Sequence, residues 1–267
     1  MKFLRVFLFC IFINSACYAV VDHNTYISSE EEFEKAYKKI ENNAVAKKML
    51  NAYQKIQTYH AVWKSNWPEA NAGQFDVDIF FDRKTNSAAF CAVQITTPQT
   101  GEKEKKLAIL IIKKNNKLSG YHNIGNSIKP EINEDMKNDS NNITYRDIRR
   151  AIFLFYPADL PLFMSEYPLC EILQGTPAFC TTDNIDANNI ALKLLCRAEL
   201  GAFLQIDKNT NLINKYYLFE QDSGQYRSLV FELTDIEFDK PLKEDAFNFD
   251  TYLIKYKIKK EECINRH

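Results

Sequence analysis

The stretch Phe75-Asp-Val-Asp-Ile-Phe-Phe-Asp82 decides the fold class. Every second position carries a large apolar side chain, namely Phe75, Val77, Ile79 and Phe81. Because successive side chains of a strand point to opposite faces, this period of two predicts a strand with one buried face. The intervening carboxylates Asp76, Asp78 and Asp82 are then expected on a solvated strand face, not in an acid–base site.

Further strands are predicted on both sides of this stretch, with short polar turns between them. They cover 89–97, 107–113 and 118–122, then 190–196, 202–207, 212–220 and 226–238, with 246–250 and 252–258 as edge strands. Residues 123–143 are rich in Asn, Asp, Ser and Lys and are expected to form a loop. Nine to eleven strands joined by hairpins form an antiparallel meander, and closing such a sheet makes a barrel.

Helical periodicity precedes and interrupts the strands. Ser29 and Glu32 form a capping box before one helix, and a second helix begins after Asn43. A third is predicted over 144–157, where a proline ends it. The apolar segment 159–164 is expected to lie across an apolar surface. No composition break divides the chain, so residues 20–267 are expected to form a single domain.

Residues 1–19 read as an export signal. A positively charged start leads into an apolar run and then to small residues that end at Ala19. A helix that crosses a bilayer needs about 20 apolar residues, and this run is shorter. The sequence therefore predicts a signal peptide over 1–19, a periplasmic location and no membrane span in the mature chain. Lipid attachment at Cys17 is the alternative.

Composition and motifs exclude several functions. The 267 residues carry 34 Lys and Arg against 35 Asp and Glu, a net charge of −1, which argues against nucleic-acid binding. Only 7 residues are glycine, and no phosphate loop, nucleophile elbow or metal-binding spacing occurs. We therefore expect no cofactor, no metal and no enzymatic activity.

Five cysteines remain after signal cleavage. Cys170 and Cys180 flank turn residues and are the candidate disulfide of an oxidising compartment. Cys91 and Cys196 lie on apolar strand faces, where small buried side chains are the simpler interpretation. The odd number leaves at least one thiol free.

Three motifs resemble one known family. These are the opening helix with the start of the first strand over 48–60, a hairpin over 206–213, and the closing pattern over 235–249. In these three places the sequence resembles the LolA/LolB/RseB-like lipoprotein-carrier superfamily. The order of signal, helix and hairpins matches as well. The resemblance implies an α+β fold, a half-open antiparallel β-barrel of about 9–11 strands wrapped around helices. The loop over 123–143, the five cysteines and the tail over 255–262 depart from that family.

What the resemblance implies is a non-enzymatic carrier. An apolar barrel cavity would hold acyl chains of a lipid or lipoprotein and hand them to an outer-membrane partner, such as a membrane-anchored receptor or donor. A regulatory protein that binds a membrane-protein segment is the alternative, and a secreted hydrolase a third. An ordinary filled core is equally compatible with the pattern.

The cavity candidates share an alternating position on the predicted strands: Phe75, Val77, Ile79, Phe81, Val93, Ile95, Ile109, Ile111, Leu192, Leu194, Leu204, Ile206, Leu229 and Phe231. A lid over the mouth is expected from Leu160, Leu162, Phe163 and Met164.

Overall fold

The computed structural model describes residues 30–66, 74–96, 104–115, 117–123, 130–137, 159–173, 179–195, 200–222 and 225–265. The predicted signal peptide, Cys17, Ser29, Cys196 and the helix expected over 144–157 lie outside these residues. Among the described residues, no helix is long and apolar enough to cross a membrane.

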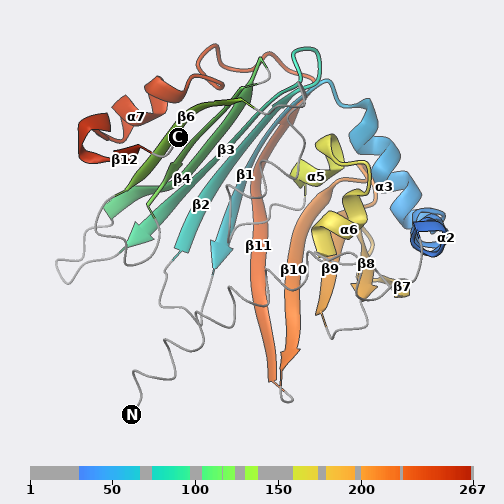
Figure 1. Ribbon diagram of the computed structural model, residues 1–267. Coiled ribbons are helices and arrows are strands. Elements are labelled where there is room, and N and C mark those ends of the chain that lie inside the picture. Colours follow the sequence, from blue (N-terminus) through green and yellow to red (C-terminus); the bar gives the residue numbers. More distant parts are fainter. Residues whose placement is uncertain are drawn as a thin grey trace.

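One curved sheet organises the described chain (Figure 1). Its strands are β1 (Thr58–Asn66), β2 (Gln74–Asp82), β3 (Ser87–Thr96), β4 (Glu104–Lys114), β5 (Lys117–His122), β6 (Glu131–Lys137), β7 (Phe179–Asn184), β8 (Asn189–Leu195), β9 (Leu200–Asp207), β10 (Ile213–Asp222), β11 (Gln225–Phe238) and β12 (Ile264–Asn265). They run in the order β12-β6-β5-β4-β3-β2-β1-β11-β10-β9-β8-β7. Neighbours are antiparallel, except that β12 pairs with β6 in parallel.

This sheet confirms the predicted fold class. The two ends of the strand order, β12 and β7, are not neighbours in it, so the sheet is half open. It bends around α5 (Asp159–Met164) and α6 (Pro168–Leu173), as Figure 1 shows. The pairing of β1 with β11 joins the two halves of the meander and brings residues far apart in the sequence into register, such as Tyr59 opposite Phe238.

Two helices precede the sheet, as the periodicity predicts. They are α2 (Glu30–Glu41) and α3 (Ala44–Lys55). Asn43 caps α3, because its side-chain oxygen accepts hydrogen bonds from the N–H groups of Val45 (3.0 Å) and Ala46 (3.3 Å). Met49 and Tyr53 lie on the buried face of α3.

Two predicted elements differ in the structure. Strand β6 lies inside the stretch expected to be a loop, where pairing with β5 outweighs the polar composition. The predicted edge strands over 246–258 are wrong, since helix α7 (Phe249–Lys255) forms there behind the cap Asn248. The alternation of aromatic and aliphatic residues suits a strand, but Tyr252 and Leu253 are buried as neighbours while Ile254 is 77% exposed, which breaks the period of two expected of an edge strand. Strand β7 was not predicted.

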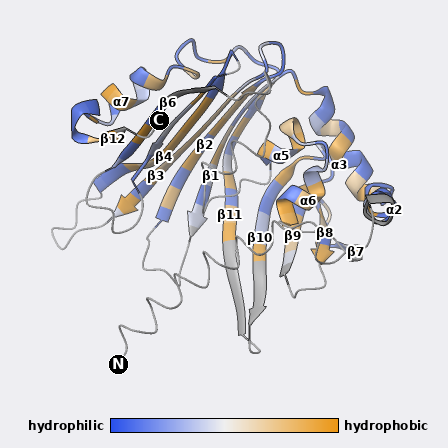
Figure 2. Cartoon of the chain, viewed as in Figure 1, coloured by the Kyte–Doolittle hydropathy of each residue, from blue (hydrophilic) through white to orange (hydrophobic). Residues whose placement is uncertain are grey.

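The sheet buries apolar side chains on both faces. Ala88, Phe90 and Ala92 of β3 point to the face covered by α3, α5 and α6, which we call the inner face. The alternate residues, Cys91 and Val93 among them, point to the face covered by α7, the outer face. In Figure 2, hydrophobic colouring marks parts of the strands and of α5 and α6, and α7 shows both hydrophilic and hydrophobic positions.

Candidate functional site

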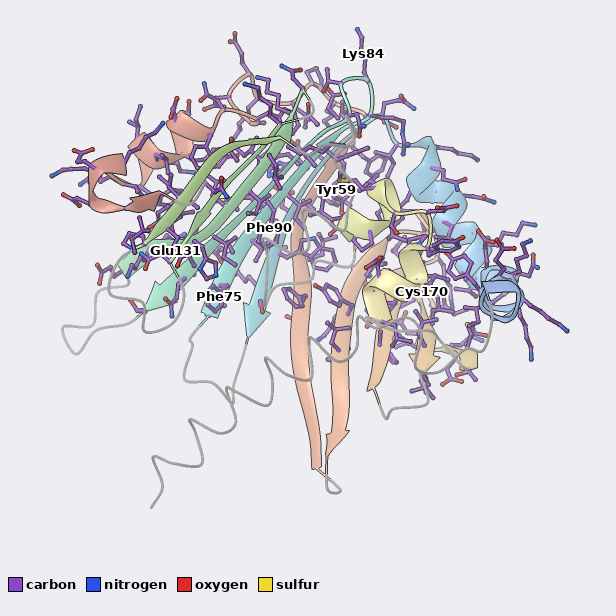
Figure 3. The ribbon with its side chains drawn as sticks, viewed as in Figure 1. Tyr59, Phe75, Lys84, Phe90, Glu131 and Cys170 are labelled. Carbon is purple, nitrogen blue, oxygen red and sulfur yellow. The ribbon has the colours of Figure 1, made fainter. Side chains whose placement is uncertain are left out.

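The inner face gathers most of the predicted cavity residues. All but three of them belong to the buried cluster of this face: Phe75, Val77, Ile79, Phe81, Ile109, Ile111, Leu192, Leu194, Leu204, Ile206 and Phe231. They come from β2, β4, β8, β9 and β11, so two distant halves of the chain supply one apolar surface. Figure 3 labels Tyr59, Phe75 and Phe90 of this face.

Two predicted cavity residues do not belong to this cluster, and the side chain of a third is not described. Val93 is wrong, because it packs on the outer face. Ile95 is half-buried and belongs to neither cluster. The side chain of Leu229 lies outside the description. The physical reason for the error at β3 is that both of its faces are apolar, and the inner set is built from Ala88, Phe90 and Ala92, which are less conspicuous in the sequence.

The predicted lid is helix α5, and it packs into the inner cluster. Leu160 and Leu162 are buried there, while Phe163 and Met164 pack against its edge. The ring of Phe163 lies 4.8 Å from that of Tyr59 and stacks on Phe81 at 4.6 Å. Helix α5 contacts α3, α6 and β2, so it fills the space between the sheet and the other helices.

A carboxylate lies at the start of α5 and inside the apolar interior. Asp159 is fully buried, and its Oδ2 accepts hydrogen bonds from the hydroxyl of Tyr59 at 2.6 Å and from Nε1 of Trp63 at 2.9 Å. Both donors are on β1, four residues apart and on one face. The other oxygen, Oδ1, is buried and has no hydrogen-bond partner among the described residues.

Burial raises the pKa of Asp159 to about 6, and the hydrogen bonds from Tyr59 and Trp63 oppose that rise. The amide N–H groups of Asp159 and Leu160 also oppose it, although neither makes a hydrogen bond to Oδ1. The pKa values of Tyr53 and Tyr59 are raised well above the ordinary range, first by burial and then by the charge of Asp159. At neutral pH Tyr53 and Tyr59 therefore stay neutral beside the carboxyl group of Asp159.

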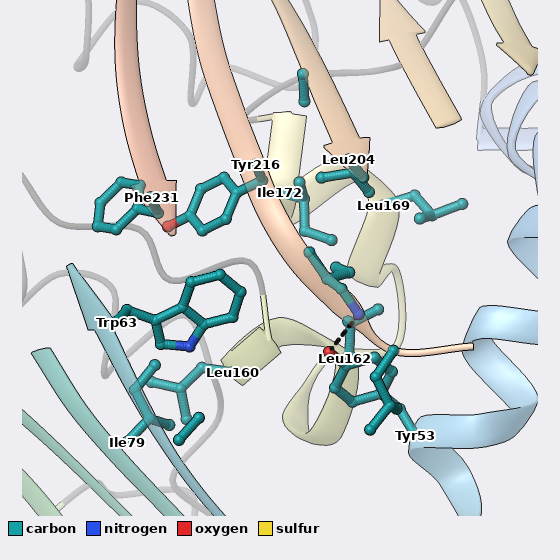
Figure 4. Close-up of a cluster of buried hydrophobic side chains, with 14 of the residues drawn as sticks. Tyr53, Trp63, Ile79, Leu160, Leu162, Leu169, Ile172, Leu204, Tyr216 and Phe231 are labelled. Carbon is teal, nitrogen blue, oxygen red and sulfur yellow. Dashed lines mark hydrogen bonds between the residues drawn. The ribbon is translucent and has the colours of Figure 1, made fainter. Parts of the chain in front are cut away.

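Aromatic rings surround this carboxylate. Trp63 packs edge-on against Tyr216 at 5.5 Å, and Tyr216 stacks on Phe231 at 4.5 Å. Figure 4 shows Trp63 between this stacked pair and Leu160 of α5. Tyr53 closes the arrangement from α3, and its hydroxyl oxygen accepts the N–H of Ile213 at 3.2 Å. The carboxylate of Asp159 therefore lies within the apolar cluster of the inner face.

A small pocket of about 120 Å³ lies on the outer face, between β1, β2 and α7. It is lined in part by His60, Asp78, Tyr252 and Lys255. Nε2 of His60 lies 3.2 Å from Asp78, and the His60 ring stacks on Phe80 at 4.2 Å. The strand face expected to be solvated is therefore partly covered by α7.

The other two carboxylates of β2 have structural partners. Asp76 accepts a hydrogen bond from Lys105 at 3.1 Å, and Asp82 accepts bonds from the N–H of Lys84 and the hydroxyl of Thr85 in the following turn. Over the described part of the chain, no three His, Cys, Asp or Glu side chains gather so that they could hold a metal ion.

The candidate disulfide stays a prediction. Cys170 of α6 is buried and Cys180 of β7 is half-buried, and both are free thiols in the structure. Burial raises the pKa of Cys170 to about 12 and that of Cys180 to about 11. Because the thiolate is the form that attacks in disulfide exchange, oxidation of this pair at neutral pH is expected to be slow once the chain has folded.

Sequence reasoning missed the polar centre of the interior. An aspartate in front of an apolar segment is usually a solvated helix cap, and its pairing with Tyr59 and Trp63 spans about 100 residues. One signal in the sequence could have indicated it. Tyr59 and Trp63 lie on one face of β1, and a buried Tyr or Trp needs a hydrogen-bond partner.

Comparison with known proteins gives similarity at the level of structures only. No family model and no curated protein matches the sequence. A chain of the MucA/MucB complex from Pseudomonas aeruginosa is similar with a TM-score of 0.42 and 10% identity, over 80% of this chain and 60% of that one. This protein thus spans less than two thirds of the length of that chain.

Two further structures are similar over nearly their whole length. An outer membrane lipoprotein-sorting protein domain from Vibrio parahaemolyticus has a TM-score of 0.35 and 9% identity, over 82% of this chain and 98% of the other. A LolA superfamily protein from Nitrosomonas europaea has a TM-score of 0.28 and 12% identity, over 77% and 98%. The superfamily that the sequence resembles is therefore among the structures found. These similarities say nothing of what this chain binds.

Proposed function

We propose that this protein is a non-enzymatic periplasmic binding protein that holds acyl chains of a lipid or lipoprotein between the inner face and α5. In this role it hands the ligand to a membrane-anchored partner. The observation that carries the proposal is the inner face itself: a half-open sheet presents large apolar side chains from both halves of the chain, and a six-residue helix covers them.

The short lid supports a chamber that opens. Isolated helices shorter than about 12 residues are marginal in water, so α5 depends on its packing and not on its own hydrogen bonds. An acyl chain can replace the contacts that Leu160 and Leu162 make with the sheet. Each CH₂ group moved out of water contributes about 0.8 kcal/mol, so a chain of about twelve carbons supplies roughly 9 kcal/mol before the cost of moving the lid.

Trp63 offers a direct test, because its indole is fully buried in the inner cluster that the acyl chain would enter. The chain has 2 tryptophans, Trp63 and Trp67, so Trp67→Phe leaves Trp63 as the single reporter. Acyl chains that carry bromine quench tryptophan on contact. We expect brominated dodecyl chains to quench Trp63 saturably, and unbrominated chains to reverse the quenching by competition.

The matched control is Ile254→Ser on the exposed side of α7, which should quench like the parent. A folded protein whose Trp63 fluorescence is untouched by brominated chains would refute the acyl-binding proposal. Binding of a membrane-protein segment by that same protein would then support the regulatory alternative.

A further inference from the structure

We propose that Oδ1 of Asp159 binds the head group of the acyl ligand, and that it selects ligands with an N–H donor next to the chain over free fatty acids. This inference rests on the proposed function and names the class of ligand for the same site. The shared chemistry is an N–H group, either an ammonium or an amide.

The two oxygens of Asp159 are used unequally. Oδ2 accepts hydrogen bonds from both Tyr59 and Trp63, and those two bonds hold this oxygen against β1. Oδ1 is buried without a partner among the described residues. A carboxylate can accept about four hydrogen bonds, so acceptor capacity remains on the side that Tyr59 and Trp63 do not occupy.

An unused buried acceptor is costly. Leaving such a group unpaired costs roughly 1–3 kcal/mol, and more when it is charged. No lysine, arginine or histidine of the described residues is hydrogen-bonded or ion-paired with Asp159, and its titratable neighbours Tyr53 and Tyr59 stay neutral. A donor on the ligand would satisfy this acceptor, whereas a fatty-acid carboxylate would place a second anion beside it.

The position of Asp159 connects head-group recognition to the lid. It is the first residue of α5, directly before Leu160 and two residues before Pro161. The apolar chain would contact the inner face while the head group contacts the helix that covers that face. Binding of the ligand's N–H group to Asp159 therefore directly affects α5, the helix that must move for the ligand to enter.

Four dodecyl ligands separate the possibilities: dodecylammonium, N-dodecylacetamide, dodecyltrimethylammonium and dodecanoate. Their affinities for the full mature protein at pH 7.5, from Trp63 quenching competition, should differ by head group. We expect dodecylammonium to bind at least about tenfold more tightly than dodecanoate, which corresponds to about 1.4 kcal/mol. Dodecyltrimethylammonium, a cation without an N–H donor, should bind clearly more weakly than dodecylammonium.

The amide ligand identifies the source of the donor. An affinity for N-dodecylacetamide close to that for dodecylammonium supports an amide-bearing ligand, and a much weaker one supports an ammonium. Asp159→Asn keeps an oxygen for Tyr59 and Trp63 but removes the charge, and should abolish the preference for dodecylammonium over dodecanoate. Asp159→Leu serves the same purpose should the asparagine variant not fold. Asp245→Asn makes the same charge change at the outer pocket and should leave the preference unchanged.

The outcomes distinguish the two proposals. If the parent binds none of the four ligands, the proposed function fails. If it binds dodecanoate as tightly as dodecylammonium, or if both Asp159 variants keep the preference, acyl binding stands and the role of Asp159 is overturned. Equal binding of dodecyltrimethylammonium and dodecylammonium would overturn the N–H donor.

Discussion

The two faces of one sheet are both buried, yet they are covered in different ways. The inner face is covered by α3, α5 and α6 and contains a buried carboxylate with an unused oxygen. The outer face is covered by the C-terminal helix α7, which buries Tyr252 and Leu253. Asp76 on this face also has one buried oxygen without a partner, but its side chain is partly exposed and its other oxygen pairs with Lys105. We infer that the outer face contributes mainly to stability. On the inner face the buried carboxylate of Asp159 lowers stability and offers a hydrogen-bond acceptor to a ligand.

The largest effect is expected from a charge introduced into the inner face. Ile79→Glu or Leu204→Glu would bury a carboxylate without a partner, which costs several kcal/mol and should abolish folding or acyl binding. Urea unfolding and Trp63 quenching measure the two effects. If both variants fold and bind acyl chains normally, these residues do not face an apolar interior. Ile254→Glu on exposed α7 is the control and should change stability by less than about 0.5 kcal/mol.

A large-to-small substitution on each face sharpens the comparison. Leu253→Ala on the outer face and Leu160→Ala on the lid both remove buried atoms, and each should cost about 2–5 kcal/mol of unfolding free energy. Only Leu160→Ala should change acyl exchange, because Leu160 covers the chamber. Stopped-flow measurement of chain release shows this. Faster release in Leu253→Ala alone would reverse the assignment of the faces.

The pH dependence of stability should differ between the parent and Asp159→Asn. The pKa of Asp159 is raised from 3.8 to about 6 on folding, so the folded parent binds an extra proton between these values. Its stability relative to Asp159→Asn should therefore fall by about 3 kcal/mol as the pH rises from 3.5 to 7. Urea unfolding at several pH values measures this. If the free energy of unfolding changes with pH in the same way in both proteins, folding does not raise the pKa of Asp159.

The smallest effect is expected at the helix caps on the two faces. Asn43→Ala removes an oxygen that serves two N–H groups of α3, and Asn248→Ala removes one that serves the N–H of Thr251 in α7. Each should cost about 1 kcal/mol, with the larger loss at Asn43. Thermal unfolding of the two variants in parallel measures the difference. A larger loss at Asn248 would mean that the outer helix contributes more to stability than its contacts indicate.

The period of two predicted the sheet and most of its inner face because pattern and burial coincide in strands such as β2. Prediction failed where both faces of a strand are apolar, as at Val93, since sequence alone does not tell which face a helix covers. Prediction also failed at α7. The aromatic residues Phe247 and Phe249 are two positions apart, as in a strand, but Asn248 between them caps a helix. Asp159 was missed because its burial depends on partners about 100 residues away.

Native mass spectrometry of the mature protein, purified from its own exporting host, tests the central claim most directly. We expect a co-purified lipid or acylated molecule that leaves on gentle activation, and its mass would show whether the head group contains nitrogen. The intact mass would also show where the signal is cleaved and whether Cys17 carries lipid. A bare protein that also fails to take up added acyl chains would contradict the account and indicate an inner face that serves only as a core.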